Sequence, residues 1–460
     1  MAGPFAAFVL RAGALRARWR RFAGASPLRR LGHATLVSAV ASLGAKGVGF
    51  VREIVVASAF GLADGVDVYL VAFVVVGFPL SILLNAAQTA LVATLASGRG
   101  DGREARAYGT TLVATLAVAL VATPLWLVAT DLAMPWIASG FDHAKRDALR
   151  HALWLLLPYT AFNAVNLLGY AVLQARHRFG VVGLLPGITP LVICLVVATH
   201  PIPGAWQLLA TGLVAGTALE CLALGAVLHH DGVRVDVDPR GTDFRHVAAA
   251  TLALLPGTLF VALGPLAEQS IAAALGSGTN SALGYGNRIP AALSGVVVMA
   301  VGTTVLPHFA SLLAAGDAAS CLHSLRKLGR LLFATGLLGA AVLALASTPI
   351  TTAVYQRGAF VAAATPRVAA VQAAYFLQLP FSLLAMLAMR TLSAARRNDT
   401  VSVLTALTVV VQVALAWTLG TRYGAAGIAT AATLATAFSA AAAFTTASRT
   451  LAASAHGGTA

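Results

Sequence analysis

The chain has 460 residues, of which 58% are hydrophobic and only 10% are charged, and its mean hydropathy is +0.83. Apolar runs of about twenty residues recur along it, each long enough for a helix to cross a bilayer, so the pattern excludes a soluble globular protein. The net charge of +15 does not indicate nucleic-acid binding, because the basic residues alternate with apolar runs and form no continuous face. The three cysteines lack metal-ligand spacing, so we predict no metal, cofactor or disulfide framework.

The first 33 residues form a basic arm in which seven arginines lie among large apolar side chains. This pattern is typical of a helix that lies in the membrane interface. The apolar run FAAFVL is too short for a secretory signal peptide. We therefore expect residues 1–33 to be a retained cytoplasmic or interfacial arm.

The apolar runs that follow the arm predict an all-α polytopic membrane protein with about twelve transmembrane helices. Prolines inside several runs predict kinks, since proline removes a backbone hydrogen bond. The predicted spans cover residues 34–58, 68–96, 108–130, 150–174, 180–199, 206–228, 246–275, 283–313, 331–354, 368–392, 400–419 and 425–447.

Most lysines and arginines outside the spans fall in alternate connections, and the positive-inside rule assigns these connections and both termini to the cytoplasm. The longest polar interruption, at 229–245, divides the spans six and six and is interpreted as a cytoplasmic linker. We expect an N-lobe at 34–228, a C-lobe at 246–447 and a cytoplasmic tail at 448–460. Parallel repeats of this kind predict a central cavity between the two lobes.

The first span holds ionised side chains inside an apolar run. An ionised group near the centre of a bilayer costs about 3 kcal/mol or more, so it is kept where water, a partner or a substrate meets it. Lys46, Gly49, Phe50 and Glu53 follow an i, i+3, i+4, i+7 spacing and share one helix face, whereas Arg52 is expected to point elsewhere.

Other polar residues are predicted at the extracytoplasmic depth of Arg52 and Glu53. Because lysine and arginine are suited to a diphosphate, we assign substrate binding to Lys46, Arg288 and Arg52. The residues assigned to a gate or to its ion pairs are Glu53, Asp67, Glu268 and Asn287. The alternative is a set of ion pairs that only fastens helices together. Glu220, in the sixth span, has no obvious partner in the sequence and receives no role.

Two stretches resemble the MviN/MurJ family of lipid II flippases, within the multidrug/oligosaccharidyl-lipid/polysaccharide exporter superfamily. The run GAKGVGFVREIVVASAFGLADGVDVYLVAF is similar to the family's first span, and YGNRIPAALSGVVVMAVGTTVLPHFASLLAAGD to its eighth. The later VYQRGAF and ARRNDT also occur in the expected order. By this resemblance Lys46 stands where the family usually has arginine, Arg52 and Glu53 match an arginine–acid pair, and Arg288 matches a cavity arginine. Asp67 and Glu268 fall at acidic positions.

The chain departs from the family pattern in three places. The run after Pro79, LSILLNAAQTALVATLA, lacks the pair of basic residues that the family typically has there. Asn287 replaces an acid that precedes the cavity arginine. Twelve spans are predicted, whereas typical lipid II flippases have two more. A divergent member that carries another undecaprenyl-linked saccharide is therefore a rival interpretation.

The predicted function is the translocation of a lipid-linked diphosphate saccharide across the bacterial cytoplasmic (inner) membrane by alternating access, without covalent chemistry. The expected partners are this substrate, membrane lipid, and a coupling ion or the membrane potential as energy source. A cation-coupled multidrug exporter is disfavoured by Lys46 and Arg288. A membrane glycosyltransferase would need catalytic groups on larger loops, and a scaffold without transport activity is a further alternative.

Overall fold

The computed structural model describes residues 27–97, 102–199 and 205–457, and this part of the chain is helical with no β-strand. Most of the predicted basic arm, residues 1–26, lies outside the described ranges. The helices are α2 (Pro27–Phe60), α3 (Asp64–Ser97), α4 (Arg103–Ile137), α5 (His143–Leu155), α6 (Leu157–Ala175), α7 (Phe179–Leu184), α8 (Ile188–Thr199), α9 (Gln207–His230), α10 (Thr242–Ala274), α11 (Thr279–Ala314), α12 (Ala318–Leu345), α13 (Ser347–Tyr355), α14 (Thr365–Leu377), α15 (Leu379–Ala394) and α16 (Asn398–Gly457), with 3₁₀ turns η1 (Leu185–Gly187) and η2 (Ala362–Ala364).

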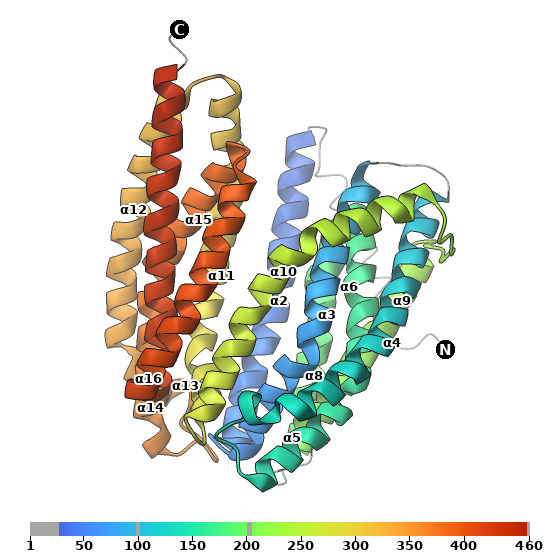
Figure 1. Cartoon of the computed structure of the whole chain (residues 1–460), viewed down its shortest axis with the longest axis vertical. Helices are drawn as coiled ribbons and strands as arrows, with labels where there is room; N and C mark the ends of the chain where they lie inside the picture. The colour runs from blue at the N-terminus through green and yellow to red at the C-terminus, as the bar shows by residue number, and fades with distance from the viewer. Residues whose placement is uncertain (1–26, 98–101, 200–204, 458–460) are drawn as a thin grey trace.

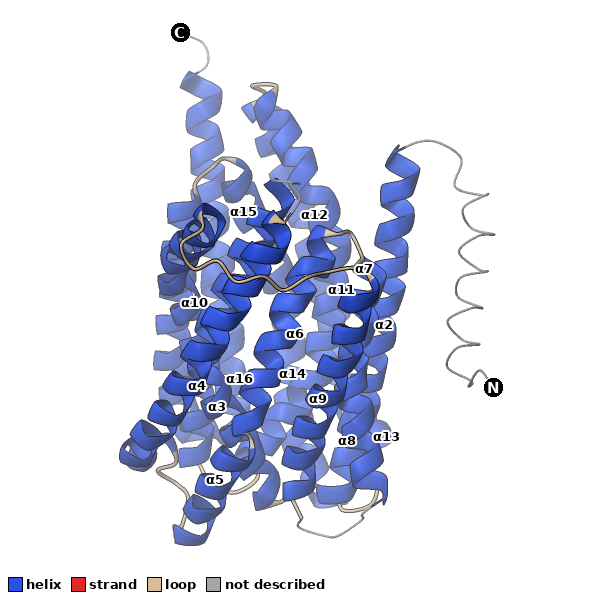
Figure 2. Ribbon diagram, turned by 90° about the vertical axis from the view of Figure 1, so that its right-hand side faces the viewer, coloured by secondary structure: helices blue, strands red, loops and turns tan. Residues whose placement is uncertain are grey.

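The helices form an elongated bundle in which most axes run along one direction (Figures 1 and 2). Within the described ranges, eight helical stretches are long and apolar enough to cross a membrane, and the bent pair of α5 and α6 adds a ninth. Large apolar side chains such as Leu120, Leu132 and Leu345 face outward, as expected where lipid is the solvent. The predicted all-α polytopic class is confirmed, and every predicted span coincides with a helix, a broken helix or part of α16.

Prolines divide three of the predicted spans into shorter helices. Pro158 follows the break at Leu156, where α5 and α6 meet at 42°. Pro186 lies in η1, between α7 and α8, and Pro380 is the second residue of α15, which Gln378 separates from the end of α14. Because proline has no N–H to donate, the helical hydrogen-bond ladder is interrupted at each site. The predicted kink at Pro158 is confirmed by the bend between α5 and α6, and the breaks at Pro158 and Pro186 border the cavity described below.

The last two predicted spans lie within α16, which is interrupted at Gly424. This residue has φ 62° and ψ −141°, a conformation that glycine adopts without the clash a Cβ would cause. The segments before and after Gly424 contact each other, since a Cβ added at Gly427 would lie 2.0 Å from the carbonyl oxygen of Leu419. Glycine at 427 therefore permits direct backbone contact between the two parts of α16.

The helices pack in two groups, with α10 between them. Helices α2 to α9 contact one another, as do α11 to α16, whereas α10 packs against α3 and α4 on one side and α16 on the other. In Figure 1, α10 crosses the face of the bundle diagonally between these neighbours. The assignment of α10 to one of two separate six-helix lobes remains a prediction.

The polar connection between α9 and α10 is the coil at 231–241, somewhat shorter than the predicted 229–245. Its backbone lies directly on α4: the amide of Asp236 donates to the carbonyl of Ala105 over 3.1 Å. A Cβ at Gly109 would lie 2.2 Å from the carbonyl oxygen of Asp236, so only glycine permits this approach. Asp231, at the start of the coil, accepts hydrogen bonds from Arg178. The connection is thus tied to the first group of helices.

Candidate functional site

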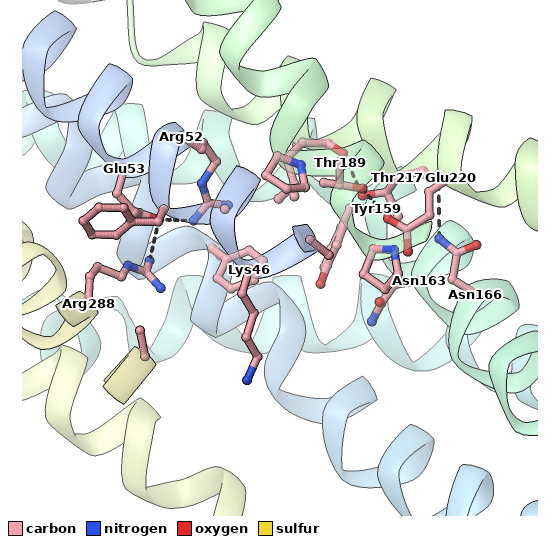
Figure 3. A pocket seen from close by; sticks show the side chains of 18 of the residues that line it. Lys46, Arg52, Glu53, Tyr159, Asn163, Asn166, Thr189, Thr217, Glu220 and Arg288 are labelled. Atoms are coloured by element: carbon pink, nitrogen blue, oxygen red, sulfur yellow. Dashed lines mark hydrogen bonds and ion pairs between the residues drawn. The ribbon is translucent and has the colours of Figure 1, made fainter. Parts of the chain in front are cut away.

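A cavity of about 540 Å³ lies between α2, α6, α8 and α9 of the first group and α11 of the second. Its volume falls within the range of about 300–1,000 Å³ that is typical of small-molecule sites. The broken helices contribute directly, because Tyr159 and Asn163 follow the break before α6, and Pro186 and Pro190 surround the break between α7 and α8. Figure 3 shows its polar side chains.

Lys46, Gly49, Phe50 and Glu53 all line this cavity, as their helical spacing predicts. The expectation that Arg52 points elsewhere is wrong, since Arg52 also lines the cavity and forms an ion pair with the neighbouring Glu53. The long arginine side chain reaches back around the helix. Sequence spacing describes where Cβ points and does not fix the position of a guanidinium several bonds away.

Glu53 is placed between two arginines from different helix groups. It pairs with Arg52 on its own helix and with Arg288 of α11, whose Nη2 lies 3.1 Å from Glu53 Oε1. The Glu53 side chain is 9% exposed, so this carboxylate is largely removed from solvent and its two partners offset the desolvation. Two guanidinium groups share one carboxylate, which leaves a net positive charge in the cluster. The structure therefore brings together Arg52 and Arg288, which the sequence assigned to substrate binding, and Glu53, which it assigned to the gate or its ion pairs.

Lys46 is the other cation that lines the cavity. Among the described residues its ammonium group has no hydrogen-bond or ion-pair partner, and the residue is exposed to the cavity. Figure 3 shows its side chain pointing away from the Arg52–Glu53–Arg288 cluster. Its Nζ lies near α11, because a Cβ added at Gly295 would come within 3.2 Å of it. An unpaired ammonium in this setting is available to an anionic ligand.

The opposite side of the cavity is formed by polar side chains of α6, α8 and α9, including Glu220, for which the sequence suggested no role. Glu220 accepts hydrogen bonds from the Tyr170 hydroxyl over 2.5 Å and the Thr189 hydroxyl over 2.6 Å. Asn166 donates to the carbonyl of Thr217 over 3.2 Å. In the sequence, the only sign of this site is that each of these spans contains polar residues. The sequence does not show that Glu220 contacts Thr189 and Tyr170, which lie 31 and 50 positions away from it. Figure 3 places Asn166, Thr189, Thr217 and Glu220 across the cavity from Arg288.

Asp67, predicted as a gate residue, lies outside the cavity at the turn between α10 and α11. Its carboxylate accepts hydrogen bonds from the amides of Gly278 and Ser281 over 2.6 and 2.8 Å, and from the Ser281 hydroxyl over 2.5 Å. Carboxylates at a helix N-terminus satisfy amides that have no partner within the helix. Asp67 thus joins α3 to the start of α11 through amides and a hydroxyl, and not through a cation.

Glu268 and Asn287, the remaining predicted gate residues, line two separate pockets. Glu268 of α10 accepts a hydrogen bond from the Tyr375 hydroxyl over 2.7 Å and faces Gln412 of α16 at 3.4 Å. It lies in a pocket formed by α10 and α16, and the structure does not bring it to Glu53 or Arg288. Asn287 is exposed in a pocket between α11, α14 and α15. Their assignment to a gate remains a prediction.

Comparison with solved structures supports the architecture. A structure titled “Lipid II flippase MurJ, inward closed conformation” superposes with a TM-score of 0.77 at 18% identity and covers 89% of this chain and 87% of that one. An inward-facing MATE-family multidrug resistance transporter of the MOP superfamily gives a TM-score of 0.69 at 14% identity, over 92% of this chain and 99% of that one. At such identities these likenesses establish the fold alone.

Sequence comparison identifies the family. A probable lipid II flippase MurJ from Rhizobium meliloti (strain 1021) is 29% identical over 419 residues, which cover 85% of this chain and 76% of the relative. One from Synechocystis sp. (strain ATCC 27184 / PCC 6803 / Kazusa) is 27% identical over 382 residues, 77% of this chain and 70% of the relative. The model of the family described as “Lipid II flippase MurJ” matches residues 56–459. This multi-pass membrane protein therefore belongs to the lipid II flippase MurJ family, as the first and eighth spans predicted.

Proposed function

We propose that this protein translocates an undecaprenyl-diphosphate-linked saccharide, of the lipid II type, across the bacterial cytoplasmic membrane. The observation that carries the proposal is the cavity among apolar helices in which Lys46 has no partner among the described residues and two arginines share Glu53. Family membership supports the flippase activity.

The arrangement of cations fits a diphosphate. Arg288 and Arg52 offer planar guanidinium groups that can form paired hydrogen bonds with phosphate oxygens, and Lys46 offers a point charge. The Glu53 carboxylate holds both guanidinium groups in place before a ligand arrives. A diphosphate that entered the cavity would compete with Glu53 for Arg288. It would also provide an anionic partner for the ammonium group of Lys46.

Translocation would proceed by alternating access. The headgroup enters the cavity from the cytoplasmic leaflet while the isoprenoid chain stays in lipid, and the two helix groups then reorient around the bound headgroup. In this scheme both termini are cytoplasmic and Asp67 contributes to the extracytoplasmic gate. Either an ion gradient or the membrane potential supplies the energy, at about 2.3 kcal/mol for each charge moved through 100 mV.

A second candidate substrate is another undecaprenyl-linked oligosaccharide, such as an exopolysaccharide or O-antigen unit. The observation that favours it is the absence of basic residues in α3 after Pro79, where the family typically has two. Depletion of the protein, followed by mass spectrometry of undecaprenyl-linked species inside the cell, distinguishes the two substrates. Accumulation of lipid II supports the first, and accumulation of a different saccharide supports the second. No accumulated species would contradict both.

Charge-neutralising variants test the site itself. Lys46→Ala and Arg288→Ala should each reduce transport about tenfold or more, since a hydrogen bond to a charged group contributes about 1.5–3 kcal/mol. Arg422→Ala is the matched control, because Arg422 is an exposed cation outside the cavity. The variants are compared at equal membrane abundance by their ability to replace the unaltered protein in depleted cells. Full activity of both cavity variants would contradict the assignment.

A further inference from the structure

A second cavity, of about 400 Å³, lies within the second group of helices beside the cationic one. Its walls come from α11, α14 and α15, and its lining residues are Asn287, Pro290, Ala291, Ser294, Gly295, Tyr375, Gln378, Leu379 and Ser382. None of these side chains carries a formal charge at neutral pH. The cavity is therefore lined by uncharged polar and apolar groups, in contrast to its neighbour.

Several hydrogen-bonding groups in this second cavity are not used by the protein. The side chains of Asn287, Ser294 and Ser382 have no hydrogen-bond partner among the described residues. Gln378 donates through Nε2 to Thr436 over 2.7 Å, which leaves its carbonyl oxygen available. The free groups thus comprise amide donors, amide oxygens and hydroxyls. On the Glu220 side of the cationic cavity, by contrast, most polar groups already bond to each other.

The two cavities meet at α11. Ala291 lines both, while Arg288 lies on the side of the first cavity and Asn287 and Ser294 on the side of the second. Gly295, in the wall of the second cavity, is the residue whose added Cβ would lie 3.2 Å from Lys46 Nζ. The ammonium group of Lys46 is therefore at the boundary between the charged and the uncharged cavity.

We propose that the second cavity binds the uncharged sugar unit that is attached directly to the diphosphate. This inference rests on the proposed function. In a lipid-linked saccharide the first sugar is joined to phosphate through one oxygen, so a sugar site has to begin within a few ångströms of the phosphate-binding cations. The position of Lys46 and Gly295 meets this requirement. Amide and hydroxyl groups match the donors and acceptors of sugar hydroxyls.

Two synthetic ligands separate the contributions of the two cavities. Purified full-length protein is titrated with undecaprenyl diphosphate and with undecaprenyl diphosphate that carries one neutral hexose. In the unaltered protein the hexose should increase affinity about tenfold or more. Asn287→Ala and Ser382→Ala should each remove about fivefold of that gain, the effect of one net hydrogen bond, and should leave the affinity for undecaprenyl diphosphate unchanged.

Two control variants complete the experiment. Asn85→Ala removes an exposed amide on α3 that bonds only within its own helix, and it should preserve the full gain from the hexose. Asn163→Ala removes an amide on the Glu220 side of the cationic cavity and should also preserve it.

The proposal is overturned if the hexose adds no affinity in the unaltered protein, if the Asn287→Ala/Ser382→Ala double variant retains the whole gain, or if only Asn163→Ala loses it. Failure of the unaltered protein to bind undecaprenyl diphosphate at all would instead overturn the proposed function, and the sugar site with it. The two failures are thus distinguishable, because the first leaves binding of the bare carrier intact.

Discussion

The two ends of the bundle hold the helix groups together in different ways. At the end that contains the α2–α3 turn, the groups are joined directly: the Ala359 amide donates to the Ser58 carbonyl over 2.8 Å, and Asp67 binds the start of α11. At the end that contains the α9–α10 coil, the described ion pairs connect α4, α10, the α6–α7 turn and the α9–α10 coil. Between these ends lies the cavity with Lys46. Opening the first end requires separation of these bonds between the two groups, whereas the ion pairs at the second end do not involve α11–α16.

The contact at the α2–α3 end is made largely by main-chain atoms. A Cβ at Gly61 would lie 2.4 Å from the Ala359 carbonyl oxygen, and one at Gly358 would lie 2.2 Å from that of Ser58. Both glycines also have positive φ, 57° and 58°. Glycine is required at these positions for two independent reasons, close approach and backbone conformation. A disulfide between cysteines introduced at 58 and 359, in a chain without its three native cysteines, would report closure of this end.

Asp67→Ala should have the largest effect on that closure. The change removes three hydrogen bonds and leaves the amides of Gly278 and Ser281 without this partner, which costs about 3 kcal/mol or more. The yield of the 58–359 disulfide under mild oxidation should fall at least tenfold. Asp131→Ala, which removes an exposed acid paired with Arg150 in the first group, is the control and should not change the yield. An unchanged yield in Asp67→Ala would show that this carboxylate does not hold the end closed.

Gly358→Ala should have the next largest effect, because the added methyl group cannot fit beside the Ser58 carbonyl. Gly316→Ala is a matched control: Gly316 also has a positive φ, 74°, but no heavy atom lies within 4 Å of its added Cβ. Both variants carry about 1 kcal/mol or more of backbone strain, and only the first carries the clash. The 58–359 disulfide yield should fall in Gly358→Ala alone. Equal yields in both would mean that close approach is unimportant there.

Lys145→Ala should weaken the same end only slightly. Lys145 pairs with Asp64 over 2.7 Å and bonds the Ser277 hydroxyl over 2.6 Å, but half of the Asp64 side chain is exposed. Pairs of this kind contribute about 0.2–1 kcal/mol. The disulfide yield should change by less than about fivefold. A loss as large as that of Asp67→Ala would indicate that Lys145 of α5 is a principal contact between the first group of helices and the α10–α11 turn.

Asp231 at the opposite end should affect stability without affecting closure. The hydrogen bond from Arg178 holds the pKa of the Asp231 carboxyl below its usual range. Because the folded-state pKa is lowered, the stabilisation is complete above the ordinary aspartate pKa and is lost as the pH falls through the folded-state value. Asp231→Asn should therefore reduce thermal stability at pH 7 more than at pH 3, with no change in the 58–359 disulfide yield. A shift in that yield would show coupling between the two ends.

Much of the fold could be predicted from the sequence, because long apolar runs, basic connections and internal prolines each have a direct structural consequence. The shared face of Lys46, Gly49, Phe50 and Glu53 was also predictable, since helical geometry alone determines it. Neighbouring spans were harder to place. Depth in the membrane suggested that Glu268 accompanies Glu53, but depth does not specify position around the bundle, and α10 places Glu268 beside Gln412 of α16.

A hydrogen bond between a side chain and a main-chain amide cannot be predicted from residue types, because every residue except proline has such an amide. Asp67 was assigned to the gate or its ion pairs, and its partners in the structure are the Gly278 and Ser281 amides and the Ser281 hydroxyl. Glu220 received no role because its partners, Tyr170 and Thr189, are uncharged residues of other spans, and the sequence did not indicate that they contact it. Arg52 differs again, since a long flexible side chain can reach a neighbour that its Cβ does not face. These are the features that require coordinates.

The interlocked glycines at 61 and 358 have a consequence for the ionic conditions in which the protein works. Dissolved salt screens charges that are exposed to water, with a Debye length of about 8 Å at physiological ionic strength. It has little influence on a steric fit between peptide groups. Closure at Gly61 and Gly358 should therefore persist when the salt concentration around the protein rises or falls, and the proposed binding of a charged headgroup by Lys46 would be the step that responds.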